Sequence, residues 1–312
     1  MRMPSCLDNK IGGVFASRHL KGPADHFEFY CSNHPETSEV VSSIVQSNLN
    51  ATGARGIFLD KILYPSPAAG LTSSLSCFCR HCTERARARD LDLRAVQKLL
   101  KSAIESPISA ETLSSLGIGG RKQSDTLIAE WQDFRAGTIT SFVGQIVRQA
   151  RAFGCDIGLD LFTPFLSDLV GQHYKSLTPL ADWIKPMIYC RSAIPSGLPI
   201  EIHGILQSIP SSAKSVLANA LDEEIPDSQT LMTEGLPLTL AVKEAARSQL
   251  WAGEIPSLAG IEVANRPGIC RIDPEIVGTY GRLLRSMTGI VASPDILLAS
   301  HNNLKALRHS LF

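Results

Sequence analysis

The chain has 312 residues, of which 44% are hydrophobic and 19% charged, so it can bury a sizeable core and is not expected to be disordered. Lysine plus arginine and aspartate plus glutamate are balanced at 30 each, and the sequence pI is about 7.1. The densest basic stretch, residues 80–94, interleaves its arginines with acidic residues and is typical of a solvated helix face. These features exclude nucleic acid as an expected partner.

The distribution of apolar residues and cysteines indicates the cellular compartment. No segment approaches about 18 uninterrupted apolar residues, and the first ten residues lack the apolar core of a signal peptide. We therefore expect a soluble, cytoplasmic protein with no membrane partner. In that reducing compartment the eight cysteines argue against a disulfide scaffold, so clustered thiols indicate metal ligands and isolated ones indicate packing residues.

Short apolar runs alternate along the chain with longer amphipathic ones. The apolar runs predict strands at residues 12–16, 27–31, 56–62, 157–162, 183–189, 260–264 and 289–292. Helical periodicity predicts helices at residues 38–49, 80–103, 129–153, 214–221, 238–252 and 274–287. Strand–helix alternation with strands this apolar predicts a parallel sheet that is buried on both faces.

These elements predict a single α/β domain over residues 1–312, a (β/α)8 barrel of the TIM type that is shortened at its N-terminus. Seven strands are visible where a closed barrel has eight. Either one strand lies unrecognised within residues 202–209, or the chain begins after the first strand. The alternative is an open doubly wound parallel sheet, which the lack of a glycine-rich phosphate turn after the first strand disfavours.

Three acidic residues lie within or at the end of apolar strands: Asp60, Asp160 and Glu262. A carboxylate in such a position is costly unless it is hydrogen-bonded, ion-paired or used in chemistry. In barrels of this class the chemistry takes place where strands end and the following loops begin. The three acids could therefore converge on one pocket. In the alternative interpretation, one or two of them form buried structural ion pairs with Lys185 or Arg18.

The cysteines of one segment have the spacing of a metal site. Cys77, Cys79 and Cys82 supply three soft ligands within six residues, and Cys31 could join them from the end of the preceding strand. Thiolates at this spacing favour tetrahedral zinc, and a closed four-ligand site would be structural rather than water-activating. His81 is an alternative fourth ligand, although simultaneous chelation with Cys82 would be strained. The simplest interpretation without metal is a group of reduced cysteines near a helix start.

The strand GIFLDKILYPSP and the following segment SCFCRHCTERAR resemble the GxxLDxxRYP strand and CxCxxC segment of bacterial glycosidase-like barrel proteins. The later stretches EWQDFRAGTITSFVGQIVRQARAFGCDIGLDLFTP and DWIKPMIYC are similar to a helix and two strands of those proteins. The resemblance covers residues 27–192 best. It departs at Ile62 and Leu63, where those proteins have an arginine close to the Tyr-Pro pair, so that the basic partner of Asp60 is either missing or replaced by Lys61.

The resemblance implies hydrolysis or transfer of a sugar, with a small-molecule carbohydrate as substrate. Cleavage of a sugar acetal generally needs two carboxyl groups. The resemblance implies that Asp60 is the nucleophile or the acid/base, with Glu262 as its partner and Asp160 as the second choice. The residues expected to contact the substrate are Lys185, Tyr189, Lys61, Tyr64 and Asn265. The alternatives are a non-catalytic barrel that binds a sugar or a protein, and a sugar-acid isomerase or lyase in which Lys185 is the base.

Overall fold

The computed structural model describes residues 30–105, 108–120, 126–265, 271–293 and 296–311. The strands are β1 (Gly56–Leu59), β2 (Asp156–Phe162), β3 (Trp183–Met187), β4 (Leu258–Glu262) and β5 (Gly289–Ser293). The longer helices are α1 (Pro35–Thr52), α3 (Arg80–Arg87), α4 (Leu93–Glu105), α6 (Leu127–Ala152), α9 (Leu198–Leu206), α10 (Lys214–Leu221), α12 (Leu238–Ala252), α13 (Pro274–Leu283) and α14 (His301–Leu311). The short helical segments are η2 (Pro67–Ala69), α2 (Leu71–Ser74), α5 (Ala110–Ser115), α7 (Pro164–Ser167), α8 (Tyr174–Leu177), η3 (Thr178–Leu180), η4 (Ser211–Ala213), α11 (Ser228–Glu234) and η5 (Ile296–Leu298).

The strands form one parallel sheet of five, in the order β1-β2-β3-β4-β5. Helical segments connect each strand to the next, as parallel pairing requires. Within the described residues the sheet is open, and closure into an eight-stranded barrel is not seen. The expected parallel α/β sheet is therefore confirmed, and the open sheet of the alternative fits the described residues better. The strands do, however, follow sequence order, whereas a doubly wound sheet reverses direction.

The apolar runs locate the strands well, with two differences. The expected strands at 12–16 and at most of 27–31 lie outside the described residues. Residues 202–209, considered above for a missing strand, belong instead to the end of α9 and the turn after it. A strand there was wrong because Pro199, in the first turn of α9, favours a helix start.

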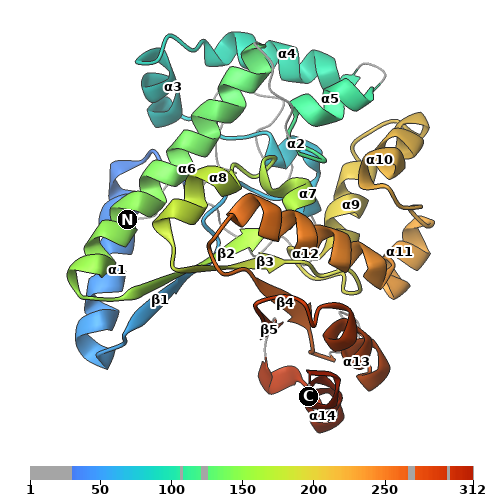
Figure 1. Cartoon of the computed structure of the whole chain (residues 1–312). Helices are drawn as coiled ribbons and strands as arrows, with labels where there is room; N and C mark the ends of the chain where they lie inside the picture. Colours follow the sequence, from blue (N-terminus) through green and yellow to red (C-terminus); the bar gives the residue numbers. More distant parts are fainter. Residues whose placement is uncertain (1–29, 106–107, 121–125, 266–270, 294–295, 312) are drawn as a thin grey trace.

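One of the predicted helices is divided into two in the structure. The periodicity over residues 80–103 predicted a continuous helix, but α3 ends at Arg87 and α4 begins at Leu93. The chain turns at Asp90, which has a φ of +59°. Aspartate tolerates this left-handed conformation better than most residues, because its short polar side chain can bond locally. The two short helices therefore take different directions, as Figure 1 shows.

Capping residues account for the helix boundaries near the sheet. Thr126 accepts a hydrogen bond from the amide of Ala129 at the start of α6, and Asp273 accepts one from the amide of Ile276 at the start of α13. Such bonds satisfy amides that have no partner inside the helix. Gly53 ends α1 with a φ of +61°.

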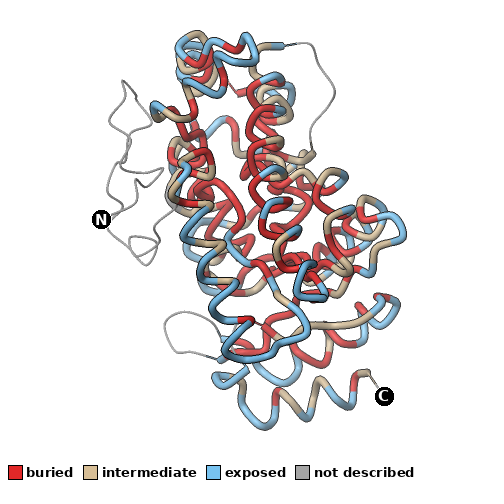
Figure 2. The backbone as a smooth tube through the Cα atoms, turned by 90° about the vertical axis from the view of Figure 1, so that its left-hand side faces the viewer, coloured by how far each residue is buried: buried red, intermediate tan, exposed pale blue. Residues whose placement is uncertain are grey.

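The helices surround the sheet so that its central strands are buried. Helices α6 and α7 contact β2, α12 contacts β3 and α13 contacts β4, while α14 packs on α13. Figure 1 shows α3, α4 and α5 together at one end of the molecule and α9, α10 and α11 at its side. Buried residues concentrate in the interior and exposed ones at the periphery (Figure 2). None of the described helices combines the length and the apolar character that crossing a bilayer requires.

Candidate functional site

Asp60 is the first residue after β1, at the C-terminal edge of the sheet. Its side chain is exposed, and its Oδ1 accepts a hydrogen bond of 2.6 Å from the amide of Lys61. Lys61 has a φ of +56°, so the chain turns sharply here. The last register pair of β1 and β2 is Leu59 with Leu159, which places Asp60 beside Asp160 at the next position. Two carboxyl groups therefore neighbour each other at this edge.

Asp160 differs from Asp60 in its surroundings. Its side chain is buried, and its Oδ2 lies 2.6 Å from the Nζ of Lys185, at the paired position on β3. Within the described residues Oδ1 of Asp160 has no hydrogen-bond partner. Burial raises the pKa of Asp160 to about 7, with Asp60 adding to the rise and Lys185 opposing it. This carboxyl group can therefore exchange a proton near neutral pH.

Lys185 joins residues of three strands into one polar network. Besides its ion pair with Asp160, it donates hydrogen bonds to the hydroxyl of Tyr189 at 2.9 Å and to Oγ of Ser293 at 3.4 Å. Burial opposes the ammonium charge, but attraction to Tyr189 and Asp160 outweighs it and raises the pKa of Lys185. Burial also raises the pKa of Tyr189. Lys185 is thus a cation near neutral pH, and a role as general base is disfavoured.

Ser293 was missed in the sequence analysis. It is the last residue of β5 and is buried, although it is a small polar residue after the apolar run of residues 289–292. A polar residue that directly follows an apolar strand was the signal that could have found it. The same signal singled out Asp60 at the end of β1.

An aromatic pair lies on the same face of the sheet as Asp60. Phe58 precedes Asp60 by two residues, so both side chains point to one side. The ring of Phe58 stacks on that of Trp183 with centroids 5.0 Å apart and an interplanar angle of 10°. Gly158 lies between them in register, and a Cβ there would come within 2.3 Å of the Trp183 ring. Phe58 is 42% exposed, so part of this pair faces solvent.

Glu262, the expected partner of Asp60, is placed differently. It ends β4 with a fully buried side chain, and it accepts hydrogen bonds from the amides of Cys190, Arg191 and Ser192. The hydroxyl of Tyr280 donates a further, very short bond to it. Burial raises the pKa of Glu262 against the effect of these donors. Both oxygens of its carboxylate therefore accept hydrogen bonds from amides of the loop after β3.

The remaining expected substrate contacts are spread over different surroundings. Lys61 is exposed beside Asp60, and Asn265 is exposed at the end of the segment after β4, where its amide donates to the carbonyl of Leu298 at 3.2 Å. Tyr64 is 2% exposed, and the Arg135 guanidinium lies 4.3 Å from its ring centroid. The structure therefore brings Lys61 to Asp60 and places Tyr64 in the core.

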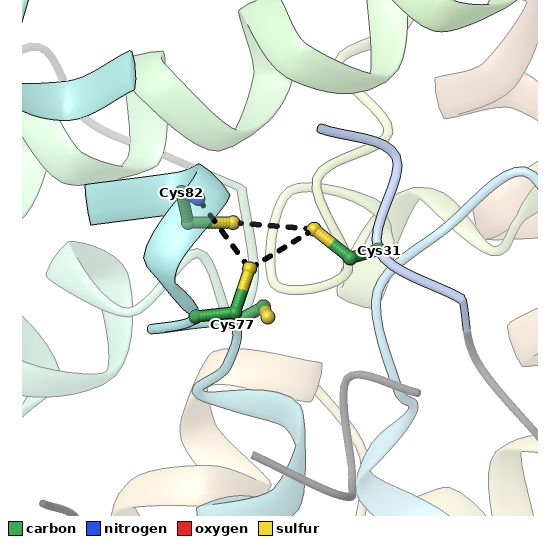
Figure 3. A group of neighbouring side chains, drawn as sticks. Cys31, Cys77 and Cys82 are labelled. Carbon is green, nitrogen blue, oxygen red and sulfur yellow. Dashed lines mark hydrogen bonds between the residues drawn. The ribbon is translucent and has the colours of Figure 1, made fainter. Parts of the chain in front are cut away.

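The four expected cysteines converge on one point. Figure 3 shows Cys31 facing Cys77 and Cys82 from a separate segment of the chain. The Sγ atom of Cys31 lies 3.4 Å from that of Cys79 and 3.5 Å from that of Cys82, and all four sulfur atoms lie within 4.8 Å of one another. Tetrahedral zinc with bonds of about 2.3 Å would hold its sulfur ligands about 3.8 Å apart. The donor set and its spacing therefore fit a four-thiolate metal site.

The surroundings of this cysteine cluster favour a closed site. Cys31, Cys77 and Cys82 are buried. The side-chain amide of Asn33 donates to the sulfur of Cys82 at 3.3 Å, a contact that would stabilise a thiolate. The hydrogen bond with Cys31 lowers the pKa of Cys79 from its usual value. His81, the alternative fourth ligand, instead packs edge-on against His34 with ring centroids 4.3 Å apart.

Fold and site together define an α/β protein with an open parallel sheet, a carboxylate–lysine network at its C-terminal edge and a four-cysteine cluster. No family model matches the sequence, and no curated protein matches it either. Among solved structures, the glycoside hydrolase domain of PgaB (BpsB) from Bordetella bronchiseptica is similar to the chain, with a TM-score of 0.56. The match covers 95% of this chain and 67% of that one, at 13% sequence identity. At this identity the likeness concerns the fold.

Proposed function

We propose that the protein is a carbohydrate-active enzyme that hydrolyses or transfers a glycosidic bond of a small sugar conjugate. One observation carries the proposal: an exposed carboxyl group, Asp60, neighbours a buried one, Asp160, whose pKa burial raises to about 7. Two carboxyl groups in such different environments suit the division of labour between nucleophile or base and proton donor. The likeness to a glycoside hydrolase domain supports the proposal at the level of the fold.

The geometry suggests how the roles are divided. Asp60 faces solvent and is the group that would act on the substrate. Asp160 is the second carboxyl group, and its Oδ1 is the atom available for a proton. Lys185 holds Asp160 in place and lowers its pKa against the effect of burial, and Tyr189 in turn accepts a hydrogen bond from Lys185. Glu262, with its oxygens occupied by amides, is assigned to the loop rather than to the reaction.

We also propose that the cysteine cluster binds a structural zinc ion through Cys31, Cys77, Cys79 and Cys82. Four thiolates leave no open position for water, so the metal would hold chain segments together without taking part in the reaction. It would join Cys31, which precedes α1, to the segment that follows β1.

The decisive experiment compares Asp60→Asn with the wild type on a panel of α- and β-linked 4-nitrophenyl glycosides and oligosaccharides. We expect the turnover of the best substrate to fall by about 10²–10⁴-fold, because one reacting carboxyl group is lost. Asp156→Asn is the matched control, since Asp156 is also exposed but lies at the N-terminal end of β2, away from Asp60 and Asp160. Full activity of Asp60→Asn, or no turnover of any glycoside by the wild type, would contradict the proposal.

A second candidate function is sugar binding without catalysis. The observation that favours it is the partly exposed pair of Phe58 and Trp183, since flat aromatic faces suit contact with the apolar side of a ligand ring. In that case Asp60→Asn would still bind an oligosaccharide that the wild type binds but does not cleave. Isothermal titration calorimetry on both proteins separates the two functions.

A further inference from the structure

The loops that follow β1, β2 and β3 share one structural device. In each of them a backbone amide donates a hydrogen bond to a buried glutamate from another part of the chain. The acceptor is Glu201 for the loop after β1, Glu244 for the loop after β2 and Glu262 for the loop after β3. All three side chains are at most 1% exposed. These loops lie at the C-terminal edge of the sheet, where Asp60 and Asp160 also lie.

Glu262 has the most complete set of donors. The amides of Cys190 and Arg191 each lie 3.0 Å from its Oε2, and that of Ser192 lies 2.5 Å from its Oε1. Three successive amides that converge on one anion form a concave binding site of the kind that proteins use for phosphate and carboxylate ligands. Here the anion belongs to the protein itself, and it fixes the path of residues 190–192.

Glu201 and Glu244 bind their loops in the same way. Glu201 accepts from the amide of Ala68 at 2.6 Å and, through its other oxygen, from that of Ser196 at 2.8 Å, so it connects the loops after β1 and β3. Glu244 accepts from Oγ1 of Thr163 and from the amide of Phe165, both at 2.6 Å. Its second oxygen pairs with Arg247 at 2.8 Å.

The burial of three carboxylates costs free energy that other interactions must offset. A buried carboxylate is costly unless donors surround it, and bonds from amides to a charged oxygen are about twice as strong as neutral ones. Backbone amides of the segments after the strands are the donors common to all three glutamates, and side chains of Thr163, Tyr280 and Arg247 add to them, so this part of the compensation exists only while each segment keeps its path. The loops and their glutamates are therefore ordered together.

We propose that Glu201, Glu244 and Glu262 are positioning residues that fix the three loops around the Asp60–Asp160 edge, and that none of them touches the substrate. The ordering of the loops is independent of what the site does. Its consequence for turnover rests on the proposed function.

Hydrogen–deuterium exchange of the full chain tests the proposal at Glu262. In Glu262→Ala we expect the amides of residues 190–192 to exchange at least tenfold faster than in the wild type. Glu262→Gln keeps the shape but turns one oxygen into a donor, so it should show a smaller rise. Acetate replaces the missing side-chain atoms of Glu262→Ala, and at 100 mM it should restore part of the protection, whereas chloride should not. Glu254→Ala, which changes an exposed glutamate in the turn between α12 and β4, is the matched control.

Two outcomes overturn the proposal. One is unchanged exchange of residues 190–192 in both Glu262 variants. The other is an equal acceleration throughout β2 and β3 in both variants, which would assign the glutamate to global stability rather than to its loop. If a glycoside substrate is found, Glu262→Ala should lose about 10–100-fold in kcat/KM and regain part of it with acetate. If no glycoside is cleaved, the proposed function fails while the exchange result still decides the positioning role.

Discussion

The Nζ of Lys185 lies 2.6 Å from Oδ2 of Asp160, across paired positions of β2 and β3, and both side chains are buried. Asp160 therefore depends on Lys185 as its charge partner, while Lys185 also donates hydrogen bonds to the hydroxyl groups of Tyr189 and Ser293. Truncation of one partner of such a pair is more damaging than replacement of both.

We expect Lys185→Met to lower the unfolding free energy by about 3–5 kcal/mol at pH 8, because Asp160 loses its partner and must either stay buried as an unpaired charge or take up a proton. Urea denaturation measures the change. The double variant Lys185→Met/Asp160→Asn should lose less than the sum of the single variants. Lys175→Met, on the exposed surface of α8, is the control and should change stability little. A Lys185→Met protein as stable as the control would contradict the ion pair.

The raised pKa of Asp160 predicts how stability depends on pH. Burial raises this pKa from 3.8 to about 7, so the folded protein holds the proton more tightly than the unfolded chain. The stabilising contribution is complete below pH about 4 and is lost as the pH rises through about 7. Urea denaturation between pH 4 and 8 should therefore show a shallower decline in Asp160→Asn than in the wild type.

Glu201 is an internal comparison for this measurement, because burial raises its pKa to about 7 as well. Glu201→Gln should flatten the same part of the profile of unfolding free energy against pH.

If the enzyme is active and Asp160 donates a proton, activity should also decline as the pH rises through about 7. A wild-type pH slope in Asp160→Asn would show that this carboxyl group does not titrate in that range.

The cysteine cluster predicts one zinc ion per chain in protein purified under reducing conditions. Metal analysis should find it in the wild type and lose it in Cys79→Ser. Free zinc at a hundredfold excess over its Kd would stabilise the wild type by at most about 2.7 kcal/mol, since cysteines of the unfolded chain also bind zinc. Cys155→Ser, a buried cysteine outside the cluster, is the control and should retain the metal. Equal metal content in Cys79→Ser and Cys155→Ser would refute the site.

The close approach of the Trp183 ring to Gly158 predicts that a larger side chain at position 158 destabilises the protein. An alanine Cβ would lie 2.3 Å from the Trp183 ring, so Gly158→Ala should cost about 1–3 kcal/mol through overpacking. Trp183→Leu in the same chain should recover part of this loss. Gly144→Ala is a suitable control, because the nearest side-chain atom there is 3.6 Å away and alanine favours the helix. Thermal unfolding compares the four proteins, and unchanged stability of Gly158→Ala would refute the packing.

The elements that the sequence predicted best depend on short-range patterns. Five apolar runs were assigned as strands within a few residues of their observed bounds, because strand formation selects apolar residues over a short run; burial on both faces adds to this in β2, β3 and β4, whereas β1 and β5 are partly exposed. The helix at residues 80–103 was wrong because periodicity continues on both sides of a turn at Asp90 that only the backbone reveals. Closure of the sheet was also beyond local patterns, since it depends on how many strands pair.

The sequence by itself determined that Asp60 ends a strand and that Cys77, Cys79 and Cys82 have ligand spacing, because both features lie within a few residues of chain. Only the tertiary structure decided which groups meet. Cys31 reaches the cluster from 48 residues before Cys79. The register of β2 and β3 places Lys185 beside Asp160, and the path of the loop after β3 brings the loop amides to Glu262. A buried carboxylate requires hydrogen-bond donors. The register of the strands and the path of the loops determine which donors it has, and both depend on how the whole chain packs.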